Sequence, residues 1–397
     1  MAAFLSGRSA PRLVSEVRGQ LRYCRFLIVI AAAALAGSRT CRAEVDWHPA
    51  RTWVFAVGVL KWQDPAVWRG MANAERNRRD VELVEHFRQA GVASERIIYL
   101  QDQTATRQRI QQELTALLSR TRPGDLLVFY YTGHGFRDRK SHEVYFANYD
   151  ATDGHNAWFV RSIYDTVEAQ FQGSRVLLMA DCCYSGALAD EARLRKTKLG
   201  YACLCSSFSH NSSTGNWTFT DCLLAGLRGR PEVDLNGDGE IAVHEVGQYS
   251  ELEMAFVERQ KSVYDNNPEF PERWRLSTPN KSRSPRQGDR VEVEWKGKWY
   301  RAQITESNAT QFKIHYVGYN SSWDEWVTSE RIRPFEPKHL DQGTAVEVRW
   351  NRDGKWYPAK VGRSWYGLTF IHYEGFSSEW DEWVNGDSIR IPAKLEK

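Results

Sequence analysis

Short apolar runs alternate with amphipathic stretches between residues 51 and 274. Within each run the apolar residues are consecutive, which is typical of strands covered on both faces of a parallel sheet. Five such runs predict strands, at residues 52–59, 96–100, 125–131, 175–180 and 201–207. The order of the runs predicts an α/β domain over residues 44–274, with a mostly parallel sheet flanked by helices.

Two of the amphipathic stretches predict helices. Residues 73–90 place Val81, Val84 and Phe87 at helical spacing and stop at Gly91, a residue suited to a helix C-terminus. Residues 107–120 predict the second helix.

The pattern changes beyond residue 288, where apolar and polar positions alternate with period two. The segment IHYVGYNSSWDEWV returns as IHYEGFSSEWDEWV at a constant offset of 57 positions (380 − 323 = 57), so two copies of one module are predicted. We expect a small all-β, SH3-like barrel in each copy, at residues 288–335 and 343–392. Residues 275–287, rich in Pro, Ser and basic residues, and residues 336–342 are predicted linkers.

The N-terminal segment has the composition of a targeting sequence. Arginines precede an apolar run at residues 26–36, and small residues follow it. This order predicts a secretory signal peptide over residues 1–43 and a secreted or periplasmic protein, with an organellar transit peptide as the alternative. The apolar run is shorter than the roughly 20 residues that cross a bilayer, so we expect no permanent membrane span.

Loss of this segment changes the charge and cysteine balance. It holds seven Arg and one Glu, so the formal net charge of +3 becomes −3 (+3 − 6 = −3), and a general nucleic-acid-binding surface is not expected. An odd number of cysteines remains, so at least one thiol stays outside any internal disulfide. These are Cys182, Cys183, Cys203, Cys205 and Cys222.

Two of the predicted strands end in residues that can perform chemistry. His134 follows the third run in YYTGHG, and Cys182 and Cys183 follow the fourth in DCCYSG. The carboxyl ends of parallel strands share one edge of a sheet, and an imidazole beside a thiol can take its proton. We therefore predict a His134–Cys183 pair that needs no cofactor, with the amides of Gly135 and Cys183 as an oxyanion hole.

The blocks YYTGHG and DCCYSG resemble the caspase and metacaspase superfamily, over roughly residues 50–265. The resemblance implies a cysteine endopeptidase acting on proteins or peptides, with Cys183 as nucleophile and Asp181 selecting a basic side chain. It implies cleavage after Arg or Lys, because the Gln-Ala-Cys run of caspases that cut after Asp is missing. Ser206 and Ser207 resemble the stretch that borders the specificity pocket. Tyr184 stands where such motifs often have His, which leaves the subtype open.

A calcium-loop pattern lies at residues 234–245, DLNGDGEIAVHE. Oxygen-bearing side chains at alternate positions suit a hard cation, and Gly239 occupies the turn position, so the loop predicts a Ca²⁺ site. A tight turn that caps the next helix is the alternative. The predicted ligand residues are Asp234, Asn236, Asp238, Glu240 and Glu245.

Each C-terminal repeat is dense in aromatic residues. Its WDEWV signature resembles the Tudor-knot, chromo-barrel and Agenet modules of the Royal superfamily, in which aromatic faces surround a methylated ammonium group. The resemblance implies that the barrels bind a peptide or another ligand, and the predicted cage residues are Tyr316, Trp323, Tyr373 and Trp380. The predicted core tryptophans are Trp299, Trp326, Trp356 and Trp383. A rival interpretation is a non-catalytic caspase-like scaffold whose barrels alone carry the function.

Overall fold

The computed structural model describes residues 46–152, 156–280, 288–335 and 340–392, apart from residues 352 and 366. The predicted signal peptide at 1–43 and most of the predicted linker at 275–287 lie outside these ranges. No helix in the described ranges is long and apolar enough to cross a membrane.

A six-stranded sheet forms the centre of the N-terminal domain, and the prediction of a mostly parallel sheet is confirmed. The strand order is β10-β8-β7-β3-β1-β2, and all neighbours are parallel except β10 and β8. The strands are β1 (Thr52–Gly58), β2 (Ile97–Gln101), β3 (Leu126–Thr132), β7 (Arg175–Asp181), β8 (Gly200–Cys205) and β10 (Val263–Asn266).

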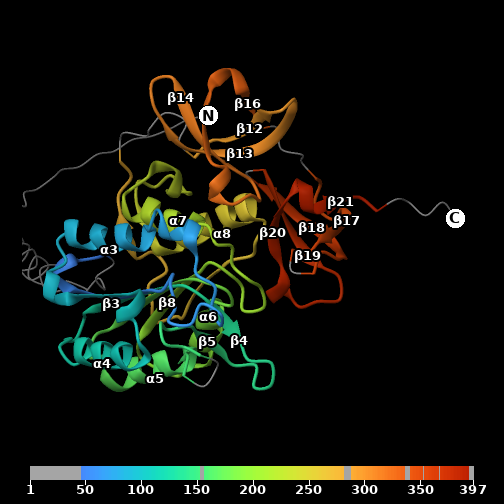
Figure 1. Cartoon of the computed structure of the whole chain (residues 1–397). Coiled ribbons are helices and arrows are strands. Elements are labelled where there is room, and N and C mark those ends of the chain that lie inside the picture. The colour runs from blue at the N-terminus through green and yellow to red at the C-terminus, as the bar shows by residue number, and fades with distance from the viewer. Residues whose placement is uncertain are drawn as a thin grey trace, which may run out of the picture. The chain divides into compact units, whose positions relative to one another are not determined.

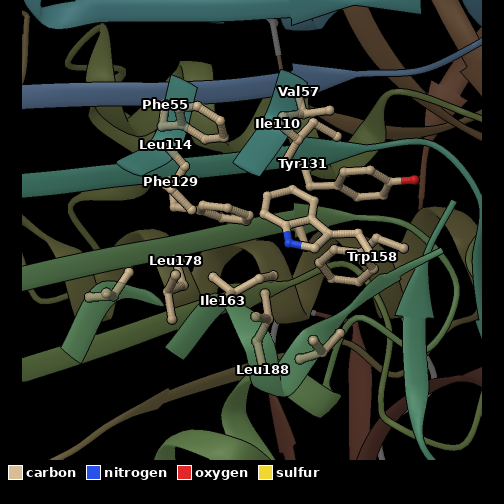
Figure 2. Packing of buried hydrophobic residues seen from close by; sticks show 14 of the residues in the cluster. Phe55, Val57, Ile110, Leu114, Phe129, Tyr131, Trp158, Ile163, Leu178 and Leu188 are labelled. Atoms are coloured by element: carbon tan, nitrogen blue, oxygen red, sulfur yellow. The ribbon is translucent and has the colours of Figure 1, made fainter. Parts of the chain in front are cut away.

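Helices cover both faces of this sheet (Figure 1). One face carries α4 (Arg107–Leu118), α5 (Val160–Gln170) and α6 (Ala187–Leu194). The other carries α3 (Arg79–Gln89), α7 (Thr218–Leu227) and α8 (Val243–Glu253). Figure 2 shows the first core, where Phe55, Phe129 and Trp158 pack with their ring centroids 5.4 to 6.3 Å apart.

The predicted helix at 73–90 is wrong as a single element. It is divided into α2 (Ala72–Glu75) and α3, and Arg78 between them is extended. The Arg78 guanidinium bonds Asp80 and also Asp102, each at 2.6 Å, so a long-range ion pair fixes the break.

Short elements complete the domain. A small antiparallel sheet contains β4 (Gly135–Arg137), β5 (Val144–Phe146) and β6 (Trp158–Phe159). The helix α8 continues into a π-helical turn, η5 (Met254–Glu258). Residues Arg275–Ser277, predicted as the start of a linker, instead form β11, which pairs with β9 (Ile241–Ala242).

Each C-terminal repeat is one curled, five-stranded antiparallel sheet, as predicted. We call them barrel 1 (residues 288–335) and barrel 2 (residues 340–392), and their strand orders, β15-β14-β13-β12-β16 and β20-β19-β18-β17-β21, are equivalent. Barrel 1 contains β12 (Arg290–Trp295), β13 (Lys298–Ser307), β14 (Gln311–Tyr316), β15 (Glu325–Thr328) and β16 (Ile332–Pro334). Barrel 2 contains β17 (Ala345–Arg349), β18 (Trp356–Trp365), β19 (Leu368–Tyr373), β20 (Glu382–Asn385) and β21 (Ile389–Arg390).

The barrel cores differ from the prediction. Trp299 and Trp326 are each 40% exposed, and neither Trp356 nor Trp383 is fully buried. Aliphatic residues on the inward side of each strand fill the interior, for example Val293, Ile304 and Ile314. Trp299 faces outward, where the Arg333 guanidinium lies 4.2 Å from its ring centre.

Candidate active site and aromatic clusters

The predicted pair His134 and Cys183 lies beyond two neighbouring strands. The last residues of β3 and β7, Thr132 and Asp181, are register partners, and His134 and Cys183 each follow two positions later. The two loops touch, because a Cβ added to Gly135 would lie 2.0 Å from the Cys183 carbonyl oxygen. The sheet therefore brings both predicted residues to one edge.

The imidazole of His134 is held by groups that the sequence did not indicate. Its Nε2 lies 2.8 Å from the carbonyl oxygen of Arg69, and its ring stacks on Trp62 with centroids 4.5 Å apart. Because a carbonyl can only accept, Nε2 carries the proton and Nδ1 keeps its lone pair. Burial lowers the pKa of His134, so the neutral ring is favoured. The loop 59–71 carries no pattern that reveals these contacts.

Cys183 is partly buried under the segment that follows β8. The Ser213 amide donates to Sγ at 3.2 Å, and the Tyr184 amide donates to the Asn211 carbonyl at 3.1 Å. Tyr184 has φ 59°, so the chain turns sharply directly after the thiol. Burial raises the pKa of Cys183, so the thiol is the favoured resting form. Both members of the pair are thus neutral at rest.

This turn is held by Cys182 and by the two serines predicted to border the specificity pocket. Cys182 is 2% exposed, and burial raises the pKa of its thiol well above the usual range. Ser206 and Ser207 are fully buried. The Ser207 hydroxyl donates to the Cys182 carbonyl at 2.9 Å, and the Ser206 hydroxyl lies 2.9 Å from that of Ser213. Their hydroxyls hold the loops around Cys183.

Asp181 is the last residue of β7, two positions before Cys183, and is almost completely buried. Thr220, in the first turn of α7, donates its hydroxyl to the Asp181 carboxylate at 2.6 Å. Burial raises the pKa of Asp181 to about 7, although the hydrogen bonds from Thr220 and Ser206 oppose the rise. This carboxylate is the acid nearest to Cys183 in the sequence.

The loop at 234–245 gathers three of its five predicted ligand residues. Carboxylate oxygens of Asp234, Asp238 and Glu245 lie within 4.8 Å of one another. Asn236 accepts from the Asp238 amide at 2.8 Å, whereas Glu240 pairs with Arg275 at 3.0 Å and is therefore directed elsewhere. The side chains of three acids on one loop suit an oxygen-seeking cation such as Ca²⁺.

The aromatic rings of barrel 1 form an edge-to-face cluster. Trp323 lies 5.7 Å from Trp295 and 5.9 Å from Tyr319 between ring centroids. Trp323 is 46% exposed, whereas Tyr316 is buried and donates its hydroxyl to Glu325 at 2.8 Å. The predicted cage residues Tyr316 and Trp323 therefore belong to one cluster, with Trp323 on its open side.

The equivalent aromatic cluster of barrel 2 contacts the N-terminal domain. Trp380 lies 5.8 Å from Trp350, and Tyr373 is buried with its hydroxyl bonded to Glu382 at 2.7 Å. Trp380 also contacts Phe208 and His210 of the peptidase-like domain, at 5.3 and 5.2 Å. The predicted cage residues Tyr373 and Trp380 again share one cluster, but here one side is covered.

Comparison with known families agrees with this architecture. Residues 78–192 match the family model of the metacaspase, peptidase C14 domain. Residues 286–334 and 340–391 match the Tudor-knot, described as the RNA binding activity-knot of a chromodomain. The N-terminal domain is therefore similar to the peptidase domain of metacaspases. The chain joins this domain to two Tudor-knot barrels of the Royal type.

Two curated relatives each match about a third of the chain. Metacaspase-1 of Candida albicans is 32% identical over 139 residues, which are 30% of this chain and 31% of that protein. Metacaspase-1 of Lodderomyces elongisporus is 31% identical over 150 residues, 32% of this chain and 33% of that protein. The chain thus spans about a third of the length of these relatives.

Solved structures align weakly. Protein GSU0716 from Geobacter sulfurreducens aligns over 58% of this chain and 100% of that chain, at 15% identity and a TM-score of 0.39. The tandem Agenet domain 3-4 of ADCP1 aligns over 26% of this chain and 78% of that chain, at 20% identity and a TM-score of 0.13. At these TM-scores neither alignment adds to the assignment.

Proposed function

We propose that this protein is a cysteine endopeptidase in which His134 activates Cys183. The observation that carries the proposal is the register of β3 with β7, which delivers both residues to one edge of the sheet. The match of residues 78–192 to the metacaspase domain supports it. The bond from His134 Nε2 to the Arg69 carbonyl fixes the tautomer that a base requires.

The proposed reaction proceeds through a thioester. His134 Nδ1 takes the Sγ proton while sulfur bonds the substrate carbonyl carbon, and the amides of Gly135 and Cys183 donate to the resulting oxyanion. The carbon–nitrogen bond then breaks, and the amine leaves with the proton from Nδ1. Water adds to the thioester after losing a proton to the same nitrogen, and that proton returns to sulfur as the carbon–sulfur bond breaks.

Specificity for Arg or Lys before the cleaved bond is part of the proposal. Asp181 precedes the nucleophile by two positions and its carboxylate is buried, so a basic side chain would favour the ionised form of Asp181 and meet a charge that water screens poorly. Ser206 and Ser207 would act by keeping this wall of the pocket in place.

The test is reporter-peptide hydrolysis together with covalent labelling. Cys183→Ala should abolish cleavage after Arg or Lys and remove labelling by an arginyl chloromethylketone. Cys182→Ala is the matched control and should keep both. Full hydrolysis by Cys183→Ala would refute the dyad, and an unlabelled, inactive wild-type protein would favour the scaffold interpretation.

A second role, in the barrels, is favoured by the open aromatic cluster of barrel 1. We propose that it binds a peptide carrying a methylated lysine, because ring faces attract a diffuse cation. Trp323→Ala should abolish the change in tryptophan fluorescence on titration with such a peptide. Trp299→Ala removes a similarly exposed tryptophan of the same barrel outside the cluster and should leave the change in place. No fluorescence change with the wild-type protein would refute the cage.

A third element of the proposal is Ca²⁺ binding at residues 234–245. Asp234, Asp238 and Glu245 would supply the carboxylate ligands, and the ion would stabilise the turn into α8. Calorimetry should detect heat on addition of Ca²⁺ to the wild-type protein and none for Asp234→Asn. Equal heats for the two proteins would refute the site.

A further inference from the structure

The aromatic cluster of barrel 1 includes Tyr319 as well as the predicted cage residues. The centroid of its ring lies 5.9 Å from that of Trp323 and 6.2 Å from that of Tyr316. Tyr319 is 41% exposed and Trp323 is 46% exposed, and their ring planes are inclined by 63°. Tyr319 and Trp323 therefore provide two exposed, inclined walls for the proposed cage.

The loop that carries Tyr319 is fixed to the N-terminal domain by hydrogen bonds. The Asn216 side chain, ahead of α7, donates to the Tyr319 carbonyl oxygen at 3.2 Å and accepts from the Ser321 amide at 3.1 Å. The Gly318 amide donates to the Val257 carbonyl oxygen in η5 at 2.7 Å. Gly318 has φ 79°, a left-handed conformation that favours glycine. Hydrogen bonds before and after Tyr319 thus hold this wall of the cage in place.

A hollow of about 740 Å³ borders both this loop and the segments that hold the catalytic pair. Its lining includes Tyr319 from barrel 1 and Arg69 and Thr214 from the N-terminal domain. The Arg69 carbonyl is the acceptor that holds His134. Thr214 directly follows the residue whose amide donates to the Cys183 sulfur. A chain lying in this hollow would therefore pass from the cage of barrel 1 towards the nucleophile.

Barrel 2 does not present its aromatic cluster to this hollow. Phe376 occupies the position equivalent to Tyr319 (376 − 319 = 57) and is 42% exposed. Of the described residues of barrel 2, the lining of the hollow includes Asn351 alone. The two repeats therefore differ in a way that bears on a substrate, because only the cluster of barrel 1 shares a hollow with the catalytic segments.

We propose that the substrate runs through this hollow between the cage of barrel 1 and the nucleophile, so that the protein preferentially cleaves proteins carrying a methylated lysine near the cleaved bond. This inference rests on the proposed peptidase activity and on the proposed cage. Once the lysine occupies the cage, binding of the cleavage site becomes intramolecular, which raises its effective concentration. Ring contacts with the lysine are the same before and during the reaction, so the preference should lie in KM rather than in kcat.

The test uses peptides with one arginine as the cleavage site and one lysine placed two to eight residues before or after it. The lysine is unmodified, trimethylated, or replaced by a side chain of the same shape with carbon in place of the charged nitrogen. Cleavage after the arginine is followed by mass spectrometry. At the best position, trimethylation should raise kcat/KM about five- to tenfold, and the uncharged side chain should lose most of this gain, because ring faces attract the cation.

Tyr319→Ala and Phe376→Ala are the matched variants, because they remove equally exposed rings from equivalent positions of the two barrels. Tyr319→Ala should bring the ratio of kcat/KM for trimethylated and unmodified peptides close to one. Phe376→Ala should keep the wild-type ratio. Trp323→Ala removes the other wall without touching the loop bonded to Asn216, and it should also lose the preference.

The outcomes separate this inference from the proposals on which it rests. Binding is measured by tryptophan fluorescence with the Cys183→Ala protein, which should hold the peptide without cleaving it. Equal kcat/KM for trimethylated and unmodified peptides at every position, with binding of the trimethylated peptide intact, would overturn this inference alone. Cleavage of none of the peptides would refute the peptidase, and absence of binding would refute the cage; the inference falls with either.

Discussion

Barrel 1 buries His315 against the N-terminal domain, whereas barrel 2 leaves about half of the equivalent His372 side chain exposed. The side chains are 8% and 48% exposed, although each bonds an aspartate nine positions later, at 2.6 and 2.7 Å. Among the described residues, His315 but not His372 faces a further acid, Glu258. The same local motif therefore gives an inter-domain contact in one copy and a surface pair in the other.

The glutamates of the two WDEWV segments, Glu325 and Glu382, have pKa values shifted in opposite directions. Glu325 accepts from Arg331 at 2.8 Å, and this bond lowers its pKa. The position equivalent to Arg331 in barrel 2 is Ser388 (388 − 331 = 57), which cannot supply a charge. Burial instead raises the pKa of Glu382. The repeated sequence thus preserves the hydrogen bond from tyrosine to glutamate, but not the charged surroundings of the glutamate.

The largest expected difference between the barrels concerns the histidines. His315→Ala should reduce stability by about 2–3 kcal/mol, because it leaves buried acids without their partner. His372→Ala should cost about 0.5 kcal/mol, as for exposed ion pairs. Thermal unfolding of both variants beside the wild-type protein measures this. Equal shifts would show that His315 is not stabilised by its contacts with the peptidase domain.

The tryptophans of the two clusters should differ next. Trp380→Ala removes ring contacts with Phe208 and His210 and should cost about 1–1.5 kcal/mol beyond the loss of area. Trp323→Ala removes ring contacts within its own barrel only, so it should cost less than Trp380→Ala. Thermal unfolding again gives the comparison, and a larger loss for Trp323→Ala would contradict the assignment of the covered cluster to barrel 2.

Much of this arrangement follows from the sequence. Consecutive apolar runs identify the parallel strands, and the strand ends then place His134 and Cys183 on one edge. The constant offset identifies the two barrels. These features are local or periodic, so a single sequence reveals them.

The remaining features depend on contacts between distant segments. Trp62 and the Arg69 carbonyl reach His134 from a loop without regular pattern, and Ser213 approaches Cys183 from another. The facing of His315 and Glu258 requires two domains to be folded together. Trp299 illustrates a different difficulty, since strand alternation alone does not say which face of a small barrel holds the large rings.

The smallest expected effect is the pH dependence of the paired glutamates. Because the folded-state pKa of Glu325 is lowered, its pair with Arg331 contributes stability above the unfolded-state pKa, near 4.3, and this contribution is lost as pH falls through the folded value. Glu325→Gln should therefore cost up to about 1 kcal/mol at pH 7, and the cost should shrink in acid.

Glu382 should show the reverse sign. Its folded-state pKa is raised, so ionisation opposes folding as pH rises from the unfolded-state value through the folded one. Glu382→Gln should leave stability at pH 7 unchanged or slightly higher, with no gain at pH 4. The test measures the unfolding free energies of Glu325→Gln and Glu382→Gln relative to the wild-type protein, each at pH 4 and at pH 7. A loss at pH 7 for Glu382→Gln as large as that for Glu325→Gln would mean that the hydrogen bond from Tyr373 outweighs the burial of the charge, and that the two barrels are electrostatically alike.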